Sequence, residues 1–111
     1  DGSFGRCAGE LETIVRLDLP VTMVVISNSV YGWIKAGQKA GYGQRYFSVD
    51  FAPPDHARDA EAYGVKAWSV TDPAELAPAL KAALAHGGPT LVDIVCQPLQ
   101  DARAPVSEWI A

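Results

Sequence analysis

The stretch that most constrains the fold is the run VTMVVI at residues 21–26, which ends abruptly in Ser27, Asn28 and Ser29. A short run of mainly β-branched apolar residues is typical of a strand buried on both faces of a parallel sheet. The three small polar residues cannot continue the strand and favour a loop at its carboxyl end. Ligands of open parallel sheets bind at the carboxyl ends of the strands. We therefore expect a binding site at this loop.

Asp1-Gly2-Ser3 is a second turn of the same kind, an acid, a glycine and a serine just before an amphipathic stretch. If this turn also follows a strand, Asp1 and Asn28 face each other at one edge of the sheet. Carboxylate and amide oxygens are hard ligands, and Mg²⁺ takes such oxygens together with those of a phosphate. The two turns thus indicate a magnesium and phosphate site. A turn placed at the very start also suggests a piece of a longer protein.

Apolar stripes and short apolar runs alternate along the rest of the chain. Asp72 and Pro73 are a strong helix start, and Gly87-Gly88 ends that helix. Alternating helices and strands predict an α/β fold, a parallel sheet with helices on both faces in three αβα layers. The expected helices are 7–17, 31–39, 57–63 and 73–86, the expected strands are 21–26, 65–70 and 90–96, and a short turn is possible at 107–110.

Composition narrows the class of protein. The 111 residues suit one domain, and 49% hydrophobic with 20% charged residues is ordinary for a globular protein. A net charge of −4 without a basic run argues against a nucleic-acid partner. The longest apolar run is too short to span a bilayer, and no signal-peptide pattern opens the chain. We expect a cytoplasmic protein without a membrane partner.

For the cysteines and histidines we favour structural roles over metal binding or catalysis. Cys7 and Cys96 belong to no CxxC pair, so we expect buried free thiols rather than metal ligands. His56 and His86 lie next to the ends of expected helices, where a solvated side chain is the favoured interpretation.

The two turns, 24 residues apart, resemble the fingerprint of thiamine-diphosphate-dependent enzymes, a Gly-Asp-Gly followed at a similar distance by Asn-Asn. GELETIVRLDLPVTMVVI, GGPTLVDIV and PVSEWIA also resemble the acetolactate synthase and benzoylformate decarboxylase branch of that family. The resemblance covers nearly all of residues 1–111 and implies one C-terminal, diphosphate-binding domain of a larger enzyme, without the strand before Asp1. The first Gly of the fingerprint is missing, and Ser27 stands where the first Asn usually does.

The resemblance implies three metal ligands in this chain. They are the carboxylate of Asp1, the side-chain oxygen of Asn28 and the backbone carbonyl of Val30. Mg²⁺ would complete its shell with the diphosphate of thiamine diphosphate and a water. Because Val30 would contribute only its carbonyl, its apolar side chain is no objection.

Five further residues are implied around the cofactor. The backbone N–H groups of Gly2 and Ser3 would donate hydrogen bonds to phosphate oxygens, since they open a helix. Tyr31 is a candidate cofactor contact through its backbone. Trp33 and Ile34 are candidates for the substrate pocket, although such residues are also common in cores.

The resemblance implies an activity for the complete enzyme, decarboxylation of a 2-oxo acid with C–C bond formation, as in acetolactate synthase. A benzoylformate-type decarboxylase is the alternative within enzymes. A non-catalytic remnant or interaction module of the same fold is the alternative of another class. A doubly wound nucleotide-binding domain is disfavoured because GxGxxG and GxxxxGK[ST] are both absent.

The resemblance also implies what lies outside this chain. The glutamate that activates the cofactor comes from a pyrimidine-binding domain of the same or a partner subunit, so we expect no catalytic residue here and no activity of the isolated domain. A homodimer or homotetramer follows from that arrangement, and FAD is an open possibility for the complete enzyme.

Overall fold

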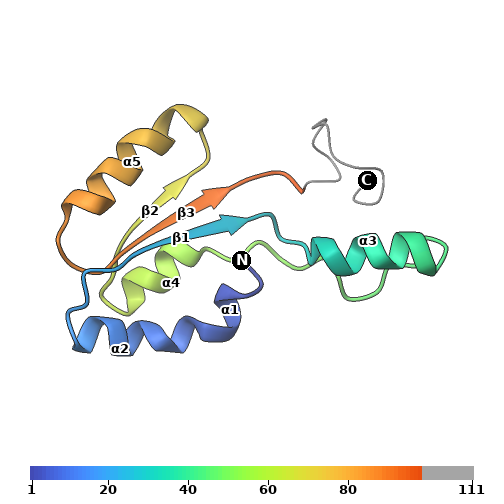
Figure 1. Ribbon diagram of the computed structural model, residues 1–111, viewed down its shortest axis with the longest axis horizontal. Helices are drawn as coiled ribbons and strands as arrows, with labels where there is room; N and C mark the ends of the chain where they lie inside the picture. The colour runs from blue at the N-terminus through green and yellow to red at the C-terminus, as the bar shows by residue number, and fades with distance from the viewer. Residues whose placement is uncertain (99–111) are drawn as a thin grey trace.

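The computed structural model describes residues 1–98, and Figure 1 shows helices packed around one sheet. The turn considered at 107–110 lies outside these residues. The elements in chain order are α1 (Phe4–Cys7), the 3₁₀ turn η1 (Ala8–Glu10), α2 (Leu11–Arg16), β1 (Thr22–Ser27), α3 (Gly32–Gly41), α4 (His56–Ala62), β2 (Lys66–Val70), α5 (Pro73–Ala85) and β3 (Thr90–Val95).

The three described strands form one parallel sheet in the order β1-β3-β2. Helices α2 and α4 cover one face of the sheet and α5 covers the other, while α3 extends beyond the carboxyl ends of the strands (Figure 1). The prediction of a three-layer α/β fold is confirmed. Each face has its own core; Leu11, Val25, Ala60, Val65 and Leu91 form the first, and Val70, Ala79, Ala83 and Val92 form the second.

Local chemistry explains where the longer helices begin and end. The side chain of Asp72 accepts a hydrogen bond from Ala74 N at 2.9 Å, and Pro73 occupies the first turn of α5. Asp55 caps α4 in the same way. Gly87 follows α5 with a φ of +80°, a conformation that suits glycine. Within residues 1–98, no helix has the length and apolar character needed to cross a bilayer.

The boundaries differ from the sequence predictions mainly by a residue or two. The first helix differs more, because it begins at Phe4 rather than at Cys7 and is interrupted by η1. Gly5 and Gly9 lie in this segment, and glycine is a poor helix former, which favours short helical pieces over one continuous helix.

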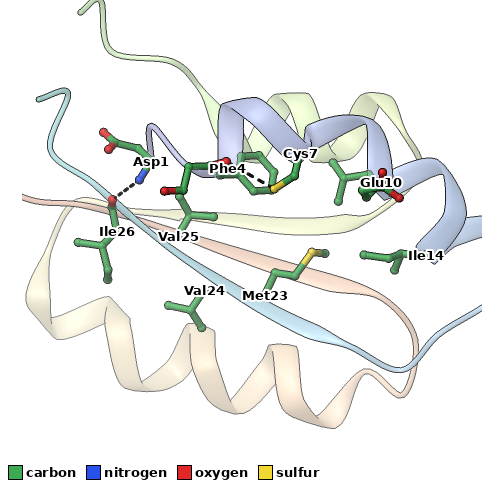
Figure 2. A pocket seen from close by; sticks show the side chains of 11 residues that line it. Asp1, Phe4, Cys7, Glu10, Ile14, Met23, Val24, Val25 and Ile26 are labelled. Carbon is green, nitrogen blue, oxygen red and sulfur yellow. Dashed lines mark hydrogen bonds between the residues drawn. The ribbon is translucent and has the colours of Figure 1, made fainter. Parts of the chain in front are cut away.

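The prediction that residues 21–26 are buried on both faces is wrong. β1 is an edge strand of the described sheet, and α5 packs over β2 and β3, so Val24 and Ile26 remain 49% and 52% exposed. Figure 2 shows these side chains on the opposite side of β1 from Phe4 and Cys7. An open, mainly apolar groove of about 420 Å³ runs between this edge and the helices α1 and α2.

The expectations for the thiols and for one histidine are also wrong. Cys7 and Cys96 are both exposed, because α1 lies at the rim of the fold and Cys96 follows the end of β3. His56 is buried, with its ring edge-on to Phe4 at a centroid distance of 4.9 Å. Packing of α4 beneath the first turn of the chain therefore overrides the usual exposure of a helix-end histidine. His86 is exposed, as expected.

Candidate functional site

The carboxylate of Asp1 joins the two turns that the sequence singles out. Asp1 Oδ2 accepts hydrogen bonds from Asn28 N at 2.9 Å and Ser29 N at 2.6 Å. Asp1 Oδ1 accepts one from Gly2 N at 2.8 Å. The backbone nitrogen of Asp1 donates to Ile26 O at 2.9 Å, at the end of β1 (Figure 2). Asp1 and Asn28 are thus neighbours at the carboxyl edge of the sheet, as the sequence predicts.

The loop after β1 turns sharply at Ser29, whose φ is +57°. This conformation is uncommon for a residue other than glycine, and it persists when the surroundings hold it. Asn28 Oδ1 accepts a long hydrogen bond of 3.3 Å from Val30 N, while Asp1 fixes the loop from the other side. The loop is therefore held by side chains on both sides.

The segment at residues 49–51, called the strap below, pairs with the same loop just before α3 begins. Val30 is 5% exposed and forms an isolated antiparallel bridge with Asp50. The hydrogen bonds on either side of this bridge run from Tyr31 N to Val49 O at 2.8 Å and from Phe51 N to Ser29 O at 3.1 Å. These two bonds leave the carbonyl of Val30 outside the bridge.

The predicted site residues line one shallow hollow of about 380 Å³. Trp33 and Ile34, in the first turn of α3, are 71% and 54% exposed beside it. The residues that line the hollow are Asp1, Gly2, Ser3, Ile26, Asn28, Val30, Tyr31, Gly32, Trp33 and Ile34. The structure thus brings together every candidate metal, cofactor and pocket residue.

Close packing of Gly2 on Tyr31 forms one wall of the hollow. A Cβ atom added to Gly2 would lie 2.4 Å from Tyr31 Cε1, which is too close for any side chain. The Tyr31 ring also packs against Phe51, with centroids 5.0 Å apart. A side chain at position 2 would therefore require the Tyr31 ring to move, and the contact with Phe51 opposes that movement.

The backbone groups expected at the phosphate are partly engaged within the protein. The N–H of Gly2 donates to Asp1, the N–H of Tyr31 donates to Val49, and the carbonyl of Tyr31 accepts from Lys35 N at 2.9 Å. Ser3 is exposed at the rim of the hollow. Their contacts with a cofactor stay a prediction.

The donor set suits magnesium. Among the described residues that line the hollow, Asp1 is the only one with a charged side chain. A carboxylate has about four lone-pair directions, and three amides of the described residues occupy Asp1, so one direction remains for a cation. No group of three or more His, Cys, Asp or Glu side chains gathers within residues 1–98. One carboxylate, one amide and one carbonyl instead match a hard cation that shares phosphate oxygens.

Sequence reasoning missed two parts of this region. One is the strap at residues 49–51, which no local pattern announces. The other is Asp93, which is 2% exposed in the central strand and accepts a hydrogen bond from Ser27 Oγ at 2.5 Å. A single acid inside the apolar run TLVDIV was the available signal, because a buried carboxylate requires a donor nearby.

A parallel sheet that presents paired turns at its carboxyl edge has the arrangement in which open α/β domains bind their ligands. Comparison with known families identifies the family to which this domain belongs. The model of the thiamine pyrophosphate enzyme C-terminal TPP binding domain matches residues 1–94. The chain belongs to this family.

Individual relatives agree with that assignment. The chain is 38% identical over 101 residues to a probable acetolactate synthase large subunit of Methanocaldococcus jannaschii, covering 90% of this chain and 17% of the relative. It is 35% identical over 94 residues to an acetolactate synthase of Bacillus subtilis, covering 85% and 16%. The thiamine diphosphate-dependent 4-hydroxybenzoylformate decarboxylase of Rhodococcus jostii superimposes with a TM-score of 0.82 at 27% identity, covering 87% of this chain and 18% of that one. The chain thus spans less than a fifth of each of these relatives.

Proposed function

We propose that this chain holds Mg²⁺ and the diphosphate of thiamine diphosphate for an acetolactate synthase-like enzyme that acts on 2-oxo acids. The observation that carries the proposal is the Asp1 carboxylate, which bonds to the amides of Asn28 and Ser29 and still has a free lone-pair direction. Family membership supports the cofactor. When bound, thiamine diphosphate supplies the carbanion chemistry that decarboxylates a 2-oxo acid and forms a C–C bond.

The chain's own residues bind and orient. Asp1, the side-chain oxygen of Asn28 and the carbonyl of Val30 would coordinate Mg²⁺. The hydrogen bonds that join the two turns hold the Asp1 carboxylate beside the backbone of Asn28 before any ligand binds, which reduces the ordering cost of binding. Gly2 and Ser3 offer backbone at the rim of the hollow, where the diphosphate would lie.

Substrate contacts would come from the apolar side of the hollow. Trp33 and Ile34 extend from the first turn of α3 beside Tyr31, so they would contact the organic part of a 2-oxo acid. The glutamate that activates the cofactor would come from a pyrimidine-binding domain of the same or a partner subunit. The complete enzyme would accordingly be a homodimer or homotetramer, and the isolated 111 residues would be inactive.

A benzoylformate-type decarboxylase is the second candidate. The observation in its favour is the close structural match to a 4-hydroxybenzoylformate decarboxylase. An assay of the complete enzyme with pyruvate and with benzoylformate separates the two activities. Acetolactate formed from pyruvate supports the first activity, whereas carbon dioxide and benzaldehyde formed from benzoylformate support the second.

Calorimetric titration of thiamine diphosphate into the complete enzyme, with and without Mg²⁺, tests the site. We expect Mg²⁺-dependent binding that Asn28→Ala abolishes. Thr71→Ala is the matched control, because Thr71 is an exposed polar residue directly after β2 that does not line the hollow, and it should bind normally. Unchanged binding in the Asn28 variant, or no binding to the unaltered enzyme, would refute the proposal.

A further inference from the structure

Two hydroxyl groups tie β1 to the central strand β3, one at each end of β1. Near its carboxyl end, Ser27 Oγ donates to Asp93 Oδ1 at 2.5 Å. At its amino end, Thr90 Oγ1 donates to Thr22 Oγ1 at 3.0 Å. Only the Ser27 bond lies next to the loop that carries Asn28, so the two bonds form a natural comparison within one strand pair.

The bond between Ser27 and Asp93 is buried and involves a carboxylate. Asp93 is 2% exposed and Ser27 is 5% exposed. In the parallel register Asp93 lies opposite Val25, so Asp93 and Ser27 are diagonal neighbours on one face of the sheet. A buried carboxylate needs donors, and a hydrogen bond from a hydroxyl to a carboxylate is stronger than one between neutral groups.

Ser27 is fixed through its backbone as well. Its carbonyl accepts a hydrogen bond from Cys96 N at 2.9 Å, the last rung between the two strands. Directly after Ser27, the N–H groups of Asn28 and Ser29 donate to Asp1. A chain of contacts therefore runs from Asp93 through Ser27 to the carboxylate of the candidate metal site.

We propose that Ser27 and Asp93 are positioning residues for the loop at residues 28–30, which carries two of the candidate metal ligands. The Asp93 carboxylate holds the Ser27 hydroxyl, which fixes the point where the chain leaves the sheet. From that point the amides of the loop reach Asp1, and the side chain of Asn28 is presented to the hollow. The consequence for Mg²⁺ rests on the proposed function, whereas the consequence for the loop does not.

Residues that hold metal ligands in place commonly change metal affinity by about 10- to 100-fold when they are removed. Ser27→Ala in the complete enzyme should therefore raise the Mg²⁺ concentration for half-maximal thiamine diphosphate binding about tenfold. Ser27→Thr keeps the hydroxyl and should restore the normal value. Thr22→Val is the matched control, since it removes a β1 hydroxyl at the far end of the strand and should leave the Mg²⁺ dependence unchanged.

Hydrogen exchange of the amides at residues 28–29 tests the loop without any cofactor. Because these amides lose a fixed anchor, their exchange should be about tenfold faster in Ser27→Ala and unchanged in Thr22→Val. Asp93→Asn, which keeps an acceptor, gives a second test if Ser27→Ala fails to fold, and it should show a smaller increase in exchange.

The outcomes separate the two proposals. Equal exchange at residues 28–29 in Ser27→Ala, Thr22→Val and the unaltered protein overturns the positioning role, even if Ser27→Ala lowers stability. Absence of Mg²⁺-dependent binding in the unaltered enzyme overturns the proposed function, and the exchange measurement still decides whether Ser27 and Asp93 position the loop.

Discussion

Substituting Gly2 by alanine probes the contact on which the geometry of the candidate site depends. The added Cβ would lie 2.4 Å from Tyr31 Cε1, whereas ordinary contacts of this kind begin near 3.4 Å, so the ring must move by about 1 Å. Phe51 packs against the same ring and opposes that movement. Overpacking of this kind costs about 1–3 kcal/mol, which corresponds to a fall in Tm of about 10 °C for a domain of this size.

Gly5→Ala is the matched control, because an added Cβ there meets no atom of residues 1–98 within 4 Å. It should be neutral or stabilise the helix by up to about 1 kcal/mol. Urea unfolding of both variants, followed by circular dichroism, measures the difference. Combining Gly2→Ala with Tyr31→Ala removes the clash, so the double variant should lose less stability than the sum of the single variants. A Gly2→Ala variant as stable as Gly5→Ala would refute this account of the turn.

Two further predictions concern residues whose environments the sequence did not reveal. His56→Phe should raise the free energy of unfolding by about 1 kcal/mol in a urea titration. Both ring nitrogens are buried without a hydrogen-bond partner among residues 1–98, and Phe keeps the ring contact with Phe4. A loss of stability would show that a polar partner satisfies the imidazole. Cys7 and Cys96 should both react with a chromogenic disulfide reagent in the folded protein, because both are exposed. Thiols that react only after denaturant is added would contradict their placement.

Most of the fold was readable from the sequence because its signals are local. The β-branched runs, the Asp72-Pro73 helix start and Gly87 each act through backbone conformations that depend on a few neighbouring residues. Their alternation restricts the topology to a parallel sheet with helices on both faces. The boundaries were less predictable, as the interrupted first helix shows, because the weak helix propensity of Gly5 and Gly9 leaves the choice to packing.

Part of the site was readable for a different reason. Asp1 and Asn28 each lie in a recognisable turn, and such turns are expected at the carboxyl edge of a parallel sheet. That the Asp1 carboxylate would accept the amides of the next loop depends on side-chain directions that spacing does not specify. The same holds for the Tyr31 ring, which packs against Gly2 and against Phe51 of the strap at residues 49–51.

The sequence by itself determined the α/β class, the positions of most elements and the pairing of an acid with an amide at one edge of the sheet. Only the tertiary structure decided which side chains are buried: it placed His56 in the core, exposed Cys7 and Cys96, left β1 at an edge and joined Ser27 to Asp93. The physical reason is the distance along the chain over which each kind of interaction acts. Turn chemistry and apolar periodicity act within a few residues, whereas burial and hydrogen bonding across strands depend on segments that are far apart in the chain.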